Sequence, residues 1–360
     1  MTTVSYVPIC VLIIVLAAVF LSSCYVPRQG YHLVAQQVAA TPMAAIPPEE
    51  RTERERELFA EVGAIRSFAA ETLGLTLGDS YTTYYRTNRD HLVDVVSAAG
   101  EFSFERKEWW FPFFGRFPYK GFYQRKPAER LARRLDNRGW DVIVRPVDAF
   151  STLGYFKDPV ISFMADYPVA RLAELIIHEA AHATLWLRSE SQFNEEFATF
   201  VGRVGSESYL VDRYGADSPE RIALVRRRRD QERFRDDVLA LKEDLRRLYG
   251  AHSTQSQSAA AALRSAKAEH ISAFQREFAR EYDARYETDI YRFFSETTVN
   301  NAYLDLFDTY SGSIDQFYQF HRRRGHGDLK TTISEVVGAA SSWQELPPGD
   351  RPDPITLLEE

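Results

Sequence analysis

The segment from Leu172 to Leu187 constrains this chain more than any other, because it is apolar nearly all round yet carries ionisable side chains. A helix that is hydrophobic on every side is buried in the core of a protein. This one nevertheless contains His178, Glu179 and His182. Burying two imidazoles and a carboxylate costs on the order of several kcal/mol unless each group finds a partner. The fold must therefore supply partners for all three.

A divalent metal would satisfy these groups together. His178 and His182 are four residues apart and share one helical face. Two neutral imidazoles at this spacing can occupy adjacent corners of a tetrahedral zinc site, with Glu179 about 100° further round the helix, beside the open corner. HEAAH is thus the H-E-x-x-H pattern of zinc hydrolases. The alternative is a helix with two hydrogen-bonded core histidines and no metal.

A catalytic zinc site needs a third protein ligand, and Glu195 is the best candidate. A histidine six residues after His182 would fit one common pattern, but Arg188 occupies that position. The segment FNEEFATFVG follows a polar turn and is typical of a helix. One face of that helix holds Glu195, Ala198, Thr199 and Gly202. The small side chains would let it approach the first helix closely. Glu196 points about 100° away and is the second candidate, and Glu190, in the turn, is less suitable.

Residues 1–24 are typical of a targeting signal, a lipoprotein signal peptide. Val7 to Leu21 is an apolar run of 15 residues, short for a membrane span and suited to a signal-peptide core. It ends in LSSC, which resembles the bacterial lipobox, so Cys24 is expected to carry the lipid anchor. No Lys or Arg precedes the run, and the alternative is an uncleaved N-terminal anchor. Both interpretations place the rest of the chain in the bacterial cell envelope, held to a membrane.

The remaining sequence predicts one large domain of the α+β class, mostly helical. Residues 25–50 are rich in small residues and proline and are expected to form a tether. Residues 51–345 form the expected domain, and residues 216–284 within it are expected to be an inserted long helical hairpin. A small β element is expected at the aromatic segment Trp109 to Phe122 and at DVIVRPV. Residues 346–360 are expected to be disordered.

Charge and cysteine content exclude some functions. The net charge of −7 provides no basic field for nucleic acid. The densest basic run, Arg226 to Arg229, lies among acidic residues and favours a solvated helix face. A protein partner of the hairpin is the other interpretation of this surface. Cys10 and Cys24 both lie in the targeting segment, so the mature domain forms no disulfide.

Several segments resemble, in the same order, the bacterial predicted-aminopeptidase family of zincin-like envelope proteins. These segments are SY at Ser80, FPFFGRFPYKGFY, DAFSTLGYFKDPV, LIIHEAAH, FNEEFATFVG and NNAYLDLFDTY. NEEFATF is also similar to the segment that supplies the glutamate ligand in gluzincin metallopeptidases. The resemblance implies a zincin-like core, peptide substrates, and one Zn²⁺ per chain held by His178, His182 and Glu195. Glu179 would then be the general base.

The resemblance also implies roles for residues outside these two helices. Zincins place a substrate-pairing strand where STLGYF stands, so the peptide is expected to lie along Ser151, Thr152, Leu153 and Gly154. The alternative for this segment is a tight structural turn. A tyrosine often stabilises the oxyanion in gluzincins. Tyr310 is the first candidate for this role and Tyr303 the second. Asn300 and Asn301 are expected either to bind the substrate backbone or to cap a helix.

The activity expected is removal of N-terminal residues from peptides in the cell envelope. One alternative is an envelope endopeptidase, and another is a non-catalytic lipoprotein that keeps the fold as a scaffold. Glu179 argues against the scaffold, because a purely structural zinc site has no use for a general base. His/His/Glu ligation favours zinc, although manganese or cobalt could occupy the same site. The carboxylate that would hold a free α-amine is not identifiable from the sequence.

Overall fold

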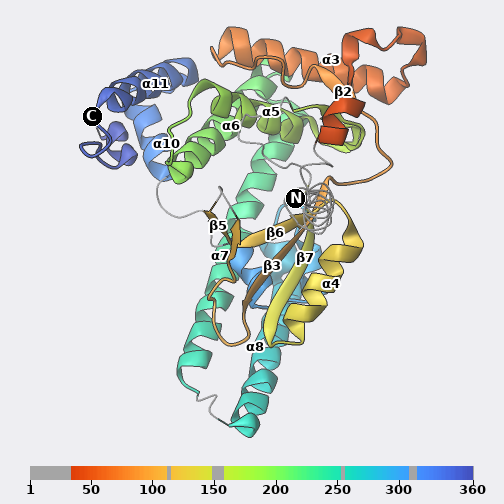
Figure 1. The fold of residues 1–360 in the computed structure, drawn as a ribbon, viewed down its shortest axis with the longest axis vertical. Coiled ribbons are helices and arrows are strands. Elements are labelled where there is room, and N and C mark those ends of the chain that lie inside the picture. Colours follow the sequence, from red (N-terminus) through yellow and green to blue (C-terminus); the bar gives the residue numbers. More distant parts are fainter. Residues whose placement is uncertain (1–33, 112–114, 148–157, 253–255, 308–313, 360) are drawn as a thin grey trace, which may run out of the picture.

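The computed structural model describes residues 34–111, 115–147, 158–252, 256–307 and 314–359. The α-helices are α3 (Glu53–Ser67), α4 (Arg125–Asp136), α5 (Val169–Thr184), α6 (Ser191–Tyr214), α7 (Pro219–Gly250), α8 (Gln257–Arg285), α9 (Asn301–Leu304), α10 (Ile314–Arg323) and α11 (Leu329–Glu345). The strands are β1 (Thr41–Pro42), β2 (Thr83–Tyr85), β3 (Val93–Gly100), β4 (Trp109–Phe111), β5 (Gly115–Phe117), β6 (Tyr119–Phe122), β7 (Trp140–Val147) and β8 (Val160–Ile161). The molecule is therefore an α+β protein that is mostly helical, as predicted (Figure 1).

The main core lies between α3, α5, α6, α10 and α11, in the upper half of Figure 1. The apolar stripe of α3 faces this core, and Leu58, Val62 and Ile65 are buried there. Ile176 of α5 and Phe197 of α6 are completely buried between the helices. Helices α5 and α6 thus form the centre of the main core, which gives the side chains between them little freedom to move.

A capping box begins α3 and also ties it to the rest of the fold. The Thr52 hydroxyl accepts a hydrogen bond from the backbone N–H of Glu55, and the Glu55 carboxylate accepts one from the N–H of Thr52. The other carboxylate oxygen of Glu55 accepts from the Arg86 guanidinium at 2.7 Å, just after β2. Glu55 is only 6% exposed, so this ion pair is largely removed from water on the carboxylate side.

Strands β6, β3 and β7 form an antiparallel sheet with β3 in the centre. Helix α4 covers one face, where Val96 and Ala98 pack against Ala128 and Leu135. Residues of β3 that point to the other face alternate with these, and Val95 on that face belongs to the main core. In Figure 1 α4 lies on one side of this sheet and α7 on the other. The second face therefore turns toward the main core and the hairpin cluster.

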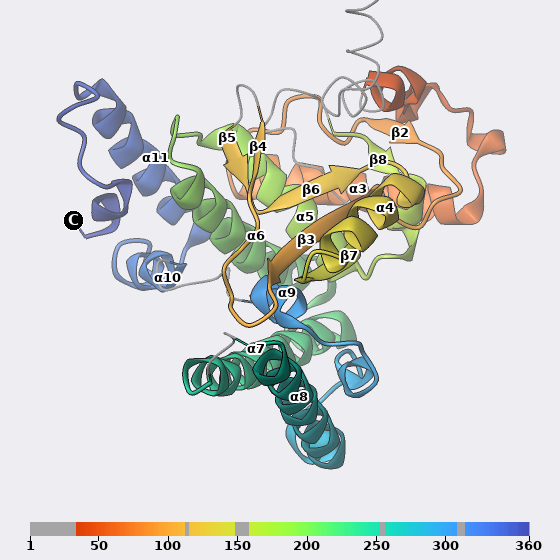
Figure 2. The same cartoon turned by 60° about the horizontal axis from the view of Figure 1, so that its bottom comes forward.

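Helices α7 and α8 form the predicted hairpin, which extends away from the main core (Figures 1 and 2). Its own apolar cluster includes Phe234, Leu241 and Phe278, together with Phe294 and Tyr303 from the following segments. Sparse apolar positions on charged helices are thus enough to build a second core when they face each other.

Two segments expected to lack structure are ordered. In the expected tether, β1 pairs with β2, and the Arg51 guanidinium donates to the carbonyl oxygens of Met43 and Ile46. In the expected disordered tail, Leu358 is 3% exposed in the main core, and the Trp343 indole N–H donates to the Pro352 carbonyl at 2.9 Å. Both predictions are wrong because a few anchoring contacts order a polar segment that composition alone would leave free.

No helix within the described ranges is long and apolar enough to cross a membrane. The predicted targeting segment and Cys24 lie outside these ranges.

Candidate metal centre

Helix α5 brings two imidazoles to the same place. It is a regular helix of 16 residues that follows Pro168 and stops before Leu185, whose backbone is extended. His178 and His182 are one turn apart, with ring centroids 4.8 Å from each other and planes nearly perpendicular. The opposite sides of the helix are buried against the main core, so the histidine face is positioned by packing on every other side.

A buried asparagine sets the turn that leads from α5 to α6. Asn194, 1% exposed, accepts a hydrogen bond from the Leu187 N–H at 2.9 Å and donates one to the Leu187 carbonyl at 2.8 Å. These two bonds close the turn and fix the first residues of α6. The next residue along the helix is Glu195, which is thereby directed at the histidines.

Close contact between the two helices depends on a glycine. A Cβ atom added at Gly202 would lie 3.0 Å from the Glu174 carbonyl oxygen and 3.1 Å from the His178 Cβ. Both neighbours belong to the rigid helix α5, so any larger side chain would push the helices apart. The prediction that small residues let α6 approach α5 agrees with this geometry.

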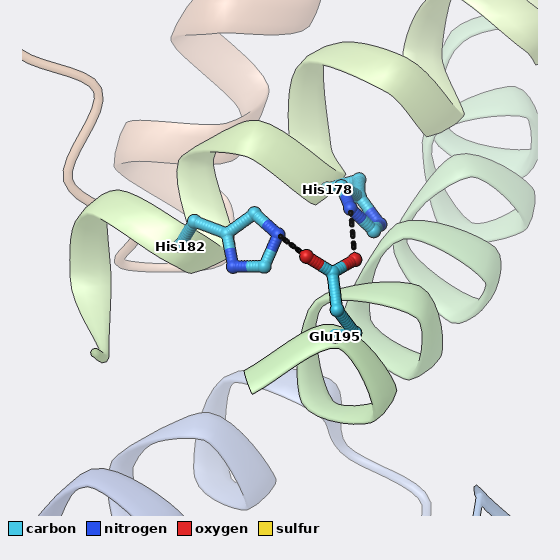
Figure 3. A group of neighbouring side chains, drawn as sticks. All are labelled: His178, His182 and Glu195. Atoms are coloured by element: carbon cyan, nitrogen blue, oxygen red, sulfur yellow. Dashed lines mark ion pairs between the residues drawn. The ribbon is translucent and has the colours of Figure 1, made fainter. Parts of the chain in front are cut away.

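His178, His182 and Glu195 form one cluster (Figure 3). One Glu195 carboxylate oxygen lies 3.7 Å from His178 Nε2, and the other lies 3.5 Å from His182 Nε2. One ligand atom from each of the three residues lies within 4.8 Å of the other two. Ligand atoms about 2.0–2.2 Å from a tetrahedral metal lie roughly 3.3–3.6 Å apart. The carboxylate points between the two rings, so the cluster needs only a small contraction to reach that geometry.

The reserve candidates lie outside this cluster. Glu196 accepts a hydrogen bond from Gln192 at 3.0 Å, and Glu190 is the residue that precedes the first turn of α6. Of the carboxylates considered from the sequence, Glu195 is the one that the fold directs at both imidazoles.

The donor set fits a divalent metal. Both ring nitrogens of His182 are buried, and neither has a hydrogen-bond partner within the described part of the chain. Burial and the neighbouring His182 hold the pKa of His178 well below its ordinary value, so its imidazole is neutral. Burial raises the pKa of Glu195, but the two histidines outweigh burial and lower it, so its carboxylate is ionised. Neutral imidazoles and a carboxylate are the protonation states that bind metal.

Glu179 lies beside this cluster with an altered pKa. The pKa of Glu179 is raised to about 7. Burial is the main cause, the Asp158 and Glu195 carboxylates also raise the pKa, and His182 opposes them. A carboxyl group with a pKa near neutrality is suited to accept and return a proton.

Asp158 and Tyr81 complete the surroundings of Glu179, and sequence reasoning assigned neither a role. Burial raises the pKa of Asp158 to about 6, which His182 opposes. No lysine or arginine of the described ranges pairs with this half-buried carboxylate. Tyr81, 3% exposed, has a φ of 59° and donates its backbone N–H to the Asp158 carbonyl at 2.6 Å. A positive φ at a bulky non-glycine residue is strained, and such strain concentrates at functional sites.

Other predicted site residues are placed elsewhere or lie outside the described ranges. Tyr303 is buried in the hairpin core against Phe294. Asn300 caps α9, its side chain accepting from the Tyr303 N–H, so of its two interpretations the structure favours capping. The residues outside the described ranges are Cys24, Ser151, Thr152, Leu153, Gly154 and Tyr310.

Asn301 is completely buried and bonded within the fold. Its side-chain nitrogen donates to the carbonyl oxygens of Gly100, Glu101 and Ser103, and its oxygen accepts from the Tyr249 hydroxyl. These bonds leave the side chain no polar atom for a ligand. Asn301 therefore holds α9 to β3 and the hairpin, and the predicted substrate-binding role is not supported.

Two imidazoles and a glutamate on a tightly packed helix pair, with a second glutamate of raised pKa beside them, form a donor set that could hold one metal ion, as single-metal hydrolase sites do. The chain belongs to the family described as Putative aminopeptidase, which matches residues 27–351. Membership in this family supports a peptidase function. No curated protein and no solved structure is significantly similar to the chain.

Proposed function

We propose that this protein is a zinc-dependent aminopeptidase with a zincin-like core, in which His178, His182 and Glu195 hold one Zn²⁺ per chain. The observation that carries the proposal is the convergence of these three donors beside a glutamate whose pKa is raised to about 7. When bound, zinc would polarise the scissile carbonyl and make a water molecule more acidic. Family membership supports the peptide as substrate.

Glu179 moves the proton in this reaction. As a carboxylate it accepts a proton from the attacking water, whose oxygen forms the new bond to the carbonyl carbon. The resulting carboxyl group then gives the proton to the leaving amine as the C–N bond breaks. A pKa of about 7 makes both transfers accessible near neutral pH.

Asp158 is the residue we assign to the free α-amine of the substrate. Its carboxylate is half-buried and interacts electrostatically with Glu179 and His182. No lysine or arginine among the described residues forms an ion pair with it. A substrate ammonium group would supply the missing cation. With Asp158→Asn, the preference for free over N-acetylated peptides should fall, mainly through KM. An unchanged preference would assign the amine to another group.

Tyr81 is a second candidate, beside Tyr310, for hydrogen bonding near the reacting carbonyl. Burial raises its pKa, and the Glu179 and Asp158 carboxylates raise it further, so its hydroxyl keeps its proton and can donate. Tyr81→Phe should lower kcat about 100-fold with little change in KM. A variant with wild-type kcat would show that the hydroxyl only packs.

The cellular setting of the proposal comes from the sequence. We propose a lipoprotein of the bacterial envelope, anchored through Cys24. Incorporation of a radiolabelled fatty acid into the wild-type chain, but not into Cys24→Ser, would support it. Labelling of both chains, or of neither, would contradict it.

The test of the function combines metal content with substrate choice. The full-length chain, purified in detergent, is assayed for bound metal and for hydrolysis of peptides with a free or an acetylated N-terminus. We expect one zinc per chain and cleavage of unblocked peptides only. Glu195→Ala should lose both zinc and activity, whereas Glu196→Ala on the same helix should keep both. Cleavage of blocked peptides would favour an endopeptidase, and zinc without any hydrolysis would favour a scaffold.

A further inference from the structure

Arg145 lies in the middle of β7, on the sheet face opposite α4. It pairs directly with Val95 of β3, so the two side chains share one face. Val95 is 3% exposed and belongs to the main core with residues of α5 and α6. Tyr119 of β6 pairs with Ser97, two residues further along β3, and so stands on the same face. Figure 2 shows β6 and β7 on the two sides of β3.

The Arg145 guanidinium has no partner inside the described part of the chain. Its Nε is buried without a hydrogen bond, and no carboxylate of the described ranges lies within ion-pair distance. Burial accordingly lowers its pKa. Arg221, Arg228 and Arg235 also have a buried Nε, but each pairs through another nitrogen with a glutamate or aspartate. Arg145 is half-buried and differs from them, because partial burial of an unpaired cation is unfavourable unless a ligand compensates.

Tyr119 links Arg145 to the metal cluster. Burial raises the pKa of Tyr119, the Glu195 carboxylate also raises it, and Arg145 lowers it. The Tyr119 hydroxyl therefore interacts electrostatically with both Glu195 and Arg145. The residue is 37% exposed, which leaves this part of the face accessible. Protonated tyrosine and guanidinium are both hydrogen-bond donors, and together they suit a carboxylate.

We propose that Arg145, assisted by Tyr119, binds a carboxylate of the substrate, so that the enzyme prefers short peptides with an anionic group near the scissile bond. The proposal rests on the proposed peptidase function. It gives the substrate two charged anchors, Asp158 for the α-amine and Arg145 for the carboxylate. The carboxylate has two sources, the free C-terminus of a dipeptide or an acidic side chain.

Two substrate pairs separate these sources. The first pair is Ala-Leu and Ala-Leu-amide, which differ in the C-terminal carboxylate. The second is Ala-Glu-amide and Ala-Gln-amide, which differ in the side chain. We expect wild-type kcat/KM to be about 10- to 100-fold higher for the anionic member of at least one pair, the range of a charge-assisted contact.

Arg145→Gln should abolish this preference by lowering kcat/KM for the anionic peptides to that for the neutral ones, while Arg145→Lys should restore part of it. Arg130→Gln, on the exposed surface of α4, is the matched control and should retain the preference. The melting temperature of Arg145→Gln should stay equal or rise, whereas a structural arginine would lower it on removal. Equal rates within both pairs in the wild type, or a preference that survives in Arg145→Gln, would overturn the proposal.

A binding measurement keeps the inference separate from the proposed function. Affinities of Ala-Leu and Ala-Leu-amide for the zinc-loaded Glu179→Gln chain are measured by calorimetry, as are those of the second pair. Tighter binding of an anionic member, lost when Arg145→Gln is added, supports the inference even if no peptide is hydrolysed. Equal binding within both pairs overturns it. Failure of all hydrolysis by the wild type would contradict the peptidase function itself.

Discussion

Where the hairpin meets the sheet, buried charged groups pair within the fold, whereas two side chains near the α5–α6 helix pair keep buried nitrogens without a hydrogen bond. Lys242 of α7 is completely buried and donates to Asp305 at 2.7 Å, and Lys267 of α8 donates to Asp141. His182, by contrast, keeps two buried nitrogens without a hydrogen bond, and Arg145 has no carboxylate among the described residues. We attribute this difference to the ligands that the helix-pair site has still to bind.

This contrast separates two uses of buried polar groups. A buried pair that satisfies itself fixes how elements dock, and breaking it costs stability. A buried group that is left unsatisfied lowers stability and persists where a ligand, metal or substrate completes it. The hairpin contacts are of the first kind, and the helix-pair site is of the second. Substitutions in the two regions should therefore affect different measurements.

The largest effect is expected for Glu179→Gln. Loss of the proton acceptor should lower kcat about 100- to 10,000-fold. Zinc content should not change, and the melting temperature should stay equal or rise, because a half-buried carboxyl group of raised pKa has been made neutral. Peptide hydrolysis, elemental analysis and calorimetry check the three outcomes. A variant with the wild-type rate would remove Glu179 from the chemistry.

Lys242→Met should show the opposite pattern. It leaves Asp305, whose side chain is 12% exposed, with Arg106 as its remaining partner. Loss of one partner of a buried pair costs about 3–5 kcal/mol, and the Arg106 contact places this variant at the lower end. Urea unfolding measures the loss, while kcat/KM of the folded fraction should stay near wild type. Unchanged stability would mean that this pair does not hold the hairpin.

Glu55 gives the fold an acid-sensitive contact at the start of α3. Burial raises its pKa, but hydrogen bonds from Thr52, Arg86 and Tyr84 outweigh burial and lower it from the ordinary 4.5 to about 2. A depressed pKa means that the stabilisation is complete above about pH 4.5 and disappears as the pH falls toward 2. The loss should be on the order of 2 kcal/mol.

The control for this pH dependence is Glu55→Gln, which should be less stable than wild type at pH 7 and should lose less stability between pH 4.5 and 2. Unfolding by urea at several pH values provides the comparison. Parallel curves for the two chains would show that Glu55 does not titrate with folding.

Gly202→Ala should have the smallest effect and the most local one. The added methyl group meets the Glu174 carbonyl and His178, so α6 must shift by a few tenths of an ångström and carry Glu195 with it. Zinc affinity, measured by competition with a chelator, should fall about 10-fold, as for other residues that support metal ligands.

Gly63→Ala is the matched control, because it also lies inside a helix but has nothing within 4 Å of the added Cβ. It should stabilise α3 by up to about 1 kcal/mol and leave zinc affinity unchanged. Equal zinc affinities in the two variants would show that close approach of α5 and α6 is not needed.

Local patterns predicted much of the helical architecture. The expected helical hairpin at residues 216–284 is close to the observed α7 and α8, which together span Pro219 to Arg285. The strand after α4 and the short strands of the aromatic segment were also predicted, and β4, β5, β6 and β7 confirm them. The central strand β3, however, was not assigned, and its place between β6 and β7 follows from pairing with distant residues.

By itself the sequence determined that two histidines share a helical face and that a glutamate follows on a helix with small residues, because such relations depend on spacing of three or four residues. Tertiary structure decided the rest. It brought Tyr81 and Asp158 close to Glu179 and placed Tyr119 and Arg145 on one face of the sheet. It also gave Asn301 a structural role. Strand register and helix packing set these relations, and both depend on contacts between residues far apart in the chain.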